Sequence, residues 1–226
     1  MKLVIANKAY SSWSLRPWIL MSMLDIPFEE DVIPLDTPEF RPRVDAYDAG
    51  STVPILVDGD VTVWESLAIM EHLAERFPER GVWPKDPKAR AFARAISNEM
   101  HAGFRALRSA CPMNVRKRHP AKDRGEAVAK DVARITHLWR SARERFGQGG
   151  PFLFGAFSAA DAMYAPVATR FAGYSVAIDP VSAAWRDAVL GTPAFRAWHA
   201  AAMAEPWVVA HDEADEPVAG PFPMPA

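Results

Sequence analysis

Three serines near the N-terminus have the chemistry and the position to act on an anion. Ser11, Ser12 and Ser14 follow the apolar run at residues 3–6 and precede an apolar helical pattern, so they lie at a strand-to-helix turn. A hydroxyl there can donate a hydrogen bond to a negatively charged atom, helped by the N–H groups and the positive end of the following helix. The alternative is that the three serines only cap the helix, and Ser14 is the best candidate for a plain cap.

Two other short motifs stand at element boundaries farther along the chain. Val53-Pro54 comes immediately before a β-rich run, where an ordinary trans proline is allowed as the first residue of a strand. Glu65 and Ser66 open a helix with one apolar stripe, and alone they indicate a helix start with favourable dipole chemistry. Each motif is weak by itself, and the motifs gain weight from their order and spacing.

Composition argues against several classes of function. The chain has 226 residues, with 26 basic and 28 acidic side chains and a formal net charge of −2, so no nucleic-acid partner is expected. No apolar stretch reaches the ~18 residues of a spanning helix, so no membrane span is expected. The six histidines are scattered, and the single cysteine, Cys111, can form neither an intramolecular disulfide nor a cysteine-rich zinc site. We expect a cytoplasmic protein without a metal, in which Cys111 is a structural thiol.

The first eighty residues predict strands and helices in the order β-α-β, a connection, then β-β-α. Residues 3–6 and 28–33 predict strands on either side of the first helix, and residues 34–50 predict a connection rich in proline and charge. An Asp-Gly pair at 58–59 lies between two β-rich runs, which is a strong hairpin signal. This order is that of a thioredoxin-like α/β domain, which we expect over residues 1–79.

A break at residues 78–88 separates this part from a second part without a convincing strand. We expect an all-helical domain over 88–212, followed by an extended tail over 213–226 whose proline-rich part, 217–226, is loosely ordered. The helical patterns run through residues 88–110, 121–146, 158–174, 180–190 and 193–204.

Four pieces of sequence, taken in order, resemble the glutathione transferase superfamily. They are the serine loop at 10–18, the Val-Pro pair at 53–54, the Glu-Ser helix start at 65–66 and the segment at 154–161. The Ser-Ser-x-Ser-x-Arg loop most resembles the zeta class, whose best-known members are maleylacetoacetate isomerases. The resemblance covers nearly the whole chain except the tail. It implies a thioredoxin-like glutathione-binding domain followed by a helical domain that holds the second substrate.

The resemblance implies a catalytic role for the serine loop. Ser11 matches the catalytic serine of the zeta class, with Ser12 beside it, and would stabilise the glutathione thiolate. A free thiol has a pKa near ~8.5, and each unit of depression requires about 1.4 kcal/mol of preferential binding. Which of the two serines contacts the sulfur stays open.

The resemblance also implies residues that bind the peptide part of glutathione. Val53, joined to Pro54 by a cis peptide bond, would pair its backbone with the cysteinyl residue. Glu65 would meet the γ-glutamyl ammonium, and Ser66 with the helix N-terminus would meet the γ-glutamyl carboxylate. The capping-box-like segment that begins at Ser158 matches a folding motif of the family, and we assign it to stability.

Trp13 departs from the zeta pattern, because those enzymes commonly have cysteine at this position. Its bulk would reshape the glutathione site beside the sulfur, which leaves transferase chemistry possible and puts the specific isomerase activity in doubt. For the second substrate we expect an apolar pocket roofed by helices of the second domain. His101 and Phe104 would face this cleft and Arg170 would meet an anionic group, although a surface or interface position for His101 is an equal alternative.

The leading functional hypothesis is a homodimeric glutathione S-transferase that joins the glutathione thiolate to small hydrophobic electrophiles. One alternative is glutathione-dependent isomerisation of maleylacetoacetate in phenylalanine and tyrosine breakdown. Another alternative is a non-catalytic member of the fold that binds hydrophobic ligands or a protein partner, because a fold does not determine a function.

Overall fold

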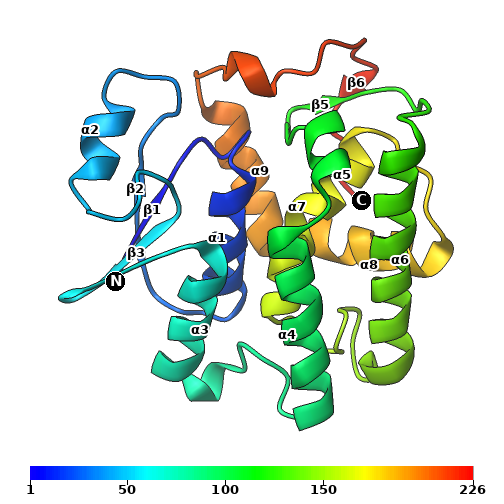
Figure 1. Ribbon diagram of the computed structural model, residues 1–226, viewed down its shortest axis with the longest axis horizontal. Helices are drawn as coiled ribbons and strands as arrows, with labels where there is room; N and C mark the ends of the chain where they lie inside the picture. Colours follow the sequence, from blue (N-terminus) through cyan, green and yellow to red (C-terminus); the bar gives the residue numbers. More distant parts are fainter. Residues whose placement is uncertain (226) are drawn as a thin grey trace.

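A four-stranded mixed sheet organises the first half of the chain in the computed structural model, which describes residues 1–225 (Figure 1). Its elements are β1 (Lys2–Ile5), α1 (Ser12–Met23), β2 (Glu29–Val32), α2 (Phe40–Asp45), β3 (Ile55–Asp58), β4 (Val61–Trp64) and α3 (Ser66–Arg76). The strand order is β2-β1-β3-β4, with β1 parallel to β2 and antiparallel to β3, and β3 antiparallel to β4. The thioredoxin-like layout and the hairpin expected from the sequence are confirmed.

Helix α1 lies between the first and the second half of the chain, which explains why most of its residues are buried. Leu15, Ile19 and Leu20 are fully buried. The helix packs against α3 and, more extensively, against α7 (Ala159–Gly173) of the second half. A helix that is buried all round needs no polar face. The loop before α1 therefore lies where the two halves meet.

The second half is helical, and one break divides the first predicted helix. Gly103 and Phe104 interrupt the pattern, and Phe104 has a left-handed backbone with φ 58°. After the 3-10 turn η1 (Pro78–Arg80), the helices are α4 (Pro87–Ala102), α5 (Arg105–Ala110), α6 (Glu126–Phe146), α7, α8 (Pro180–Leu190) and α9 (Pro193–Ala204). None of the helices within residues 1–225 combines the length and the apolarity that crossing a membrane requires.

Helix α7 is the buried centre of the second half. Its N-terminus has the capping box expected at Ser158, in which the Asp161 carboxylate accepts the backbone N–H of Ser158 at 2.9 Å. Asp161 also accepts hydrogen bonds from the Leu153 N–H and from the indole N–H of Trp185. These contacts tie a loop and a second helix to α7, which agrees with a role of this motif in stability.

The C-terminal tail is docked, contrary to the expectation from the sequence. Strand β5 (Lys117–Arg118) pairs antiparallel with β6 (Gly220–Pro221), in a region where no strand is predicted, since two residues show no periodicity. Phe222 is buried against the helices. The prediction of a loosely ordered tail is wrong for these residues, and Ala226, the last residue of the predicted tail 213–226, lies outside the described residues.

Candidate active site

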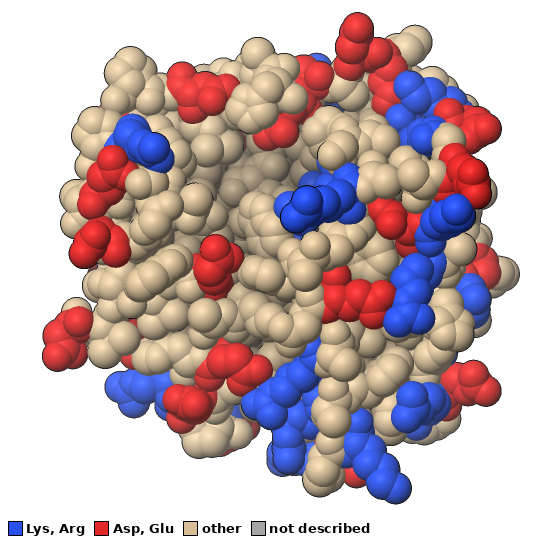
Figure 2. All heavy atoms as spheres, viewed as in Figure 1, with Lys and Arg blue, Asp and Glu red and all other residues tan. Residues whose placement is uncertain are grey.

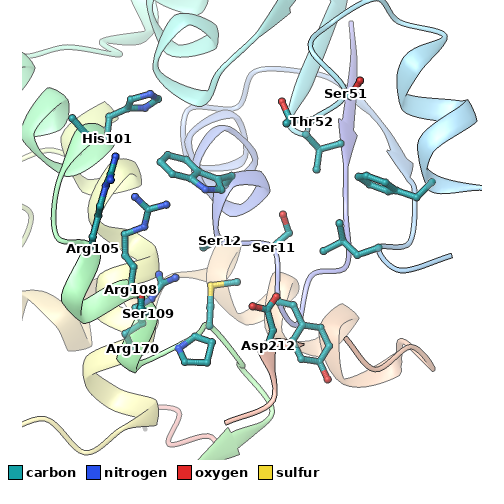
Figure 3. Close-up of a pocket in the computed structure, with 18 residues that line it drawn as sticks. Ser11, Ser12, Ser51, Thr52, His101, Arg105, Arg108, Ser109, Arg170 and Asp212 are labelled. Carbon is teal, nitrogen blue, oxygen red and sulfur yellow. The ribbon is translucent and has the colours of Figure 1, made fainter. Parts of the chain in front are cut away.

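A cavity of about 860 Å³ lies where the two halves meet (Figures 2 and 3). The β1–α1 turn, the segment before β3, the end of α4, α5, α7 and the 3-10 turn η2 (Ala210–Asp212) contribute to its walls. Figure 2 shows a hollow on one face of the molecule with basic side chains at its border. The cavity thus collects residues that are far apart in the sequence.

Both predicted catalytic serines line this cavity, at the start of α1 (Figure 3). Ser11 is the N-cap: its Oγ accepts the Ser14 N–H at 3.4 Å and lies 2.7 Å from Ser14 Oγ. Ser12 is the first helical residue, and its hydroxyl has no hydrogen-bond partner among the described residues. The assignment of Ser14 as the plain cap is wrong, because Ser14 is fully buried inside the helix and its Oγ accepts the Ala6 N–H at 3.0 Å.

The Ser11–Ser14 pair can direct a proton towards the cavity. Ser14 Oγ accepts the Ala6 N–H, and in this structure the Ser11 hydroxyl also donates to Ser14 Oγ. Both groups are hydroxyls whose protons can rotate, so with an anion in the cavity Ser11 can turn its proton to the anion while Ser14 donates to Ser11. Hydrogen bonds in such a chain polarise one another, so Ser11 becomes a stronger donor than an isolated serine.

Trp13 lines the cavity and is held by two guanidinium groups. Arg16 lies over the indole at 4.0 Å from the ring centroid, and Arg108 lies over it at 4.7 Å. The His101 ring meets the indole edge-on at 5.2 Å. Cation–π contacts of this kind contribute about 0.5–2 kcal/mol each. They fix the bulky side chain beside Ser12, in the place where the zeta pattern has cysteine.

The Val53–Pro54 peptide bond is cis, which confirms this part of the expectation. Val53 lines the cavity together with Ser51 and Thr52 (Figure 3). Pro54 is buried behind Val53 and does not line the cavity. Val53 therefore offers its backbone at the cavity wall, as a peptide ligand requires.

The start of α3 separates the roles expected for Glu65 and Ser66. Glu65 has φ 67°, an uncommon conformation for a non-glycine residue, and its Oε2 lies 3.6 Å from His101 Nε2. Ser66 is fully buried and its hydroxyl faces Met163 Sδ at 3.9 Å, so the structure does not bring this side chain to a ligand. Within residues 1–225 no side chain caps α3, which leaves its first N–H groups open to an anion.

Of the three residues expected to face the second substrate, two line the cavity. His101 lies at the end of α4, and Arg170 reaches the cavity from α7. Arg170 is mostly buried, and its guanidinium donates to the carbonyls of Cys111 and Pro166. The prediction for Phe104 is wrong, because its left-handed backbone at the α4–α5 break places it in the hydrophobic core and outside the cavity lining.

An arginine wall, formed by Arg105, Arg108 and Arg170, replaces the apolar pocket expected for the second substrate (Figure 3). Arg105 and Arg108 are three residues apart on α5, so they project from one face of that helix. This i,i+3 spacing is the signal in the sequence that could have indicated the wall. The wall makes this side of the cavity cationic.

The arginines around the cavity repel one another, and Asp212 offsets this repulsion only in part, at Arg170. Burial, together with Arg170 and Arg108, holds the pKa of Arg16 well below its usual range. Burial and Arg108 lower the pKa of Arg170 to about 10, and burial and Arg105 lower the pKa of Arg108. In the described part of the chain no carboxylate forms an ion pair with these four arginines. The cavity therefore favours an anionic ligand, which would relieve the repulsion.

Tyr10 is another hydroxyl at the cavity that the sequence analysis did not single out. Its hydroxyl donates to Glu213 Oε1 at 2.6 Å. Burial, together with this hydrogen bond, raises the pKa of Tyr10 to about 12. Tyr10 is thus protonated at neutral pH with its proton engaged, and the serines are the hydroxyls available to an anion.

The described residues, 1–225, contain no group of three or more His, Cys, Asp or Glu side chains arranged to hold a metal ion. Burial raises the pKa of Cys111 to about 11, so this thiol is not an activated nucleophile. The chemistry of the cavity therefore rests on hydroxyl groups, helix N-termini and guanidinium groups.

Two protein-family models match this chain. "Glutathione S-transferase, N-terminal domain" matches residues 10–76, and "Glutathione S-transferase, C-terminal domain" matches residues 125–201, together more than half of the sequence. The chain belongs to the glutathione S-transferase superfamily. The first match contains the serine loop, the cis Val53–Pro54 bond and the start of α3.

Individual relatives within the superfamily match over shorter stretches. A dichloromethane dehalogenase from Methylorubrum extorquens is 46% identical over 68 residues, which are 28% of this chain and 23% of the relative. A probable maleylacetoacetate isomerase from Caenorhabditis elegans is 37% identical over 98 residues, which are 43% of this chain and 45% of the relative. The chain thus spans less than half the length of these two relatives.

Solved glutathione transferase structures match almost the whole fold. A maleyl pyruvate isomerase, a bacterial zeta-class member, superposes with a TM-score of 0.68 at 20% identity, over 91% of this chain and 99% of that one. A glutathione transferase homologue from Burkholderia with bound glutathione gives a TM-score of 0.68 at 19% identity, over 90% of this chain and 98% of that one. At these identities the likeness establishes the fold: a thioredoxin-like domain followed by a helical domain.

Proposed function

We propose that this glutathione S-transferase family member binds glutathione as co-substrate and joins its thiolate to small electrophiles that carry a carboxylate. The observation that carries the proposal is the pairing, in one cavity, of the Ser11–Ser12 turn with the arginine wall. The first feature suits a thiolate and the second suits an anionic second substrate. Membership of the family and the glutathione-bound relative support the choice of thiol.

In this proposal the first domain binds and activates glutathione. Val53 pairs its backbone with the cysteinyl residue, while Glu65 and the open N-terminus of α3 bind the γ-glutamyl group. Ser11 stabilises the thiolate through a hydrogen bond that the Ser14 hydroxyl polarises. Ser12, Trp13 and His101 complete the wall beside the sulfur.

The second domain determines which kind of electrophile binds. The sequence alone favours hydrophobic electrophiles, but three guanidinium groups lie where an apolar pocket is expected. Guanidinium groups recognise carboxylates through paired, charge-assisted hydrogen bonds. The carboxylate would sit at the arginine wall and leave the reactive carbon towards the thiolate.

Glutathione-dependent isomerisation of a carboxylate-bearing substrate is the second candidate. The arginine wall favours it as well, and relatives named maleylacetoacetate isomerase are among the matches. The difference is Trp13, which stands where zeta enzymes commonly have cysteine. Isomerisation regenerates glutathione, whereas transfer consumes it.

Turnover with a matched pair of electrophiles tests the proposal. We expect 3-chloropropionate to react faster, relative to its uncatalysed rate, than neutral 3-chloropropanamide, with one glutathione consumed per chloride released. Equal rate enhancement for the two electrophiles would contradict recognition of the carboxylate by the arginine wall. Maleylacetoacetate converted without loss of glutathione would favour the isomerase. Glutathione bound without any turnover would favour a non-catalytic binding protein.

We further propose a cytoplasmic homodimer. The buried, unpaired Cys111 suits a reducing compartment. Val61 and Trp64 on the edge strand β4 are each 44% exposed, and exposed apolar side chains on a sheet edge suit contact with a second copy. Sedimentation velocity of the protein at micromolar concentration checks this, and a monomer would contradict it.

A further inference from the structure

The segment from Glu205 to Glu213 carries an acidic side chain, Asp212, into the cavity and is anchored on both sides of it. Glu205 accepts the backbone N–H groups of Lys8 at 2.7 Å and Ala9 at 3.2 Å. Glu213 accepts the Tyr10 hydroxyl at 2.6 Å. These bonds fix the segment to the loop between β1 and α1, so Asp212 is held at the cavity wall.

Asp212 has no structural partner that explains its place. Its carboxylate makes no hydrogen bond within residues 1–225, and its nearest recorded charged contact is His211 Nε2 at 3.9 Å. Its side chain is 28% exposed, and burial raises its pKa, partly offset by His211 and Arg170. A partly desolvated carboxylate with no hydrogen bond, and with only a 3.9 Å contact to an exposed imidazole, is costly unless a ligand provides the missing donor.

Asp212 is also not the counter-ion of the arginine wall. Figure 3 shows Asp212 on the side of Ser11, opposite Arg105, Arg108 and Arg170. Asp212 and Arg170 influence each other's charge, but they form no ion pair within 4.0 Å, and Arg170 donates to backbone carbonyls instead. Among the described residues that line it, the cavity therefore has a cationic wall and, apart from that wall, one carboxylate, that of Asp212.

We propose that Asp212 determines specificity: the second substrate is an electrophile of the amino-acid type, with its carboxylate at the arginine wall and its ammonium at Asp212. This inference rests on the proposed function and narrows its substrate class. A dianionic substrate would place a second negative charge near Asp212 and be disfavoured. A substrate with an ammonium group supplies the donor that Asp212 lacks.

The test compares two glutathione conjugates that differ in one group. S-(2-amino-2-carboxyethyl)glutathione carries the ammonium, and S-(2-carboxyethyl)glutathione has the same skeleton without it. Calorimetric dissociation constants are measured for both conjugates and for glutathione, with the wild type, Asp212→Asn and Asp215→Asn. Asp215 is exposed, lies just after this segment and serves as the matched control.

We expect the wild type and Asp215→Asn to bind the amino conjugate about tenfold more tightly than the other, because the ammonium gains a charge-assisted hydrogen bond. Asp212→Asn should abolish this difference and leave glutathione affinity unchanged. A preference retained in Asp212→Asn, or absent from the wild type while glutathione binds normally, would overturn the inference alone. Equal weakening of glutathione and both conjugates would show that Asp212 serves the co-substrate. Failure of the wild type to bind glutathione would overturn the proposed function, and this inference with it.

Discussion

Ser11 Oγ lies 2.7 Å from Ser14 Oγ, so the serine at the cavity is backed by a second, fully buried hydroxyl. Ser14 in turn accepts the backbone N–H of Ala6 at the end of β1. The pair connects the sheet to the candidate catalytic position through hydrogen bonds. A serine supported in this way keeps a fixed orientation and is a better donor than one exposed to water.

Removal of the buried hydroxyl should affect both stability and chemistry. We expect Ser14→Ala to lower the free energy of unfolding by about 1–3 kcal/mol, because the Ala6 N–H loses its acceptor in the interior. The same variant should raise the pKa of the thiol of bound glutathione, because Ser11 loses its hydrogen bond with Ser14. Urea unfolding and thiolate titration check the two effects, and Ser109→Ala, an exposed cavity residue, is the control. Unchanged stability of Ser14→Ala would contradict the contribution of the Ala6–Ser14 hydrogen bond. An unchanged pKa of the glutathione thiol would contradict the support of Ser11 by Ser14.

The arginine wall can be tested at Arg108, whose guanidinium lies over the Trp13 ring. Arg108 forms no hydrogen bond within the described residues, so Arg108→Gln should leave the fold intact. We expect kcat/KM for 3-chloropropionate to fall about 10–100-fold, the range of a charged hydrogen bond, and that for 3-chloropropanamide to change little. Arg105→Gln, at the exposed end of the wall, should give a smaller loss. An equal loss for both electrophiles would mean that Arg108 does not read the carboxylate.

Trp13 should act by holding the guanidinium groups over its ring. Trp13→Phe keeps an aromatic face for Arg16 and Arg108, whereas Trp13→Ala removes it. We expect Trp13→Ala to lose about 1–2 kcal/mol of stability and to raise KM for the carboxylate substrate, with Trp13→Phe between it and the wild type. Thermal unfolding and steady-state kinetics measure the two effects. If both variants had wild-type KM, Trp13 would be only a wall of the cavity.

The docking of the tail should depend on pH through Glu213. Burial alone would raise its pKa, but hydrogen bonds from Lys117 and Tyr10 outweigh burial and hold the pKa below the ordinary 4.5. Because the folded-state pKa is lower, the contribution of Glu213 is fully present above pH 4.5 and is lost as pH falls through the folded-state value.

Glu213→Gln should therefore be less stable than the wild type at pH 7, by about 1–2 kcal/mol. The difference should shrink as the pH falls below 4.5. Urea unfolding at pH 7, 5 and 4 measures it, with Asp215→Asn as control. A difference that stays constant with pH would show that Glu213 acts through its shape and not through its charge.

The fold could be predicted from the sequence because its signals are local. The strand periods, the Asp-Gly hairpin and the apolar stripes predict the elements to within a few residues. The break at Phe104 could not be foreseen, because it depends on a left-handed backbone at a residue that is not glycine. The docked tail also escaped prediction, since a two-residue strand and ion pairs such as that between Arg124 and Glu216 join residues far apart in sequence.

In the candidate site, too, local motifs predict some residues and leave others unpredicted. Ser11, Ser12 and Val53 reach the cavity because motif order determines where the ends of β1 and β3 lie. Ser66 points away because the backbone of Glu65 turns it inward, which no sequence spacing reveals. Asp212 comes from the opposite end of the chain and lacks any local motif.

The most direct test of the account is the pKa of the glutathione thiol on the enzyme. Ultraviolet absorbance of the thiolate is titrated with the wild type, Ser11→Ala and, as the neighbouring control, Ser12→Ala. We predict a thiolate at neutral pH on the wild type and on Ser12→Ala, and a thiol pKa about 1–2 units higher on Ser11→Ala, as expected for one lost charged hydrogen bond. Bound glutathione that stays protonated on the wild type, or a Ser11→Ala variant that titrates like the wild type, would contradict the account.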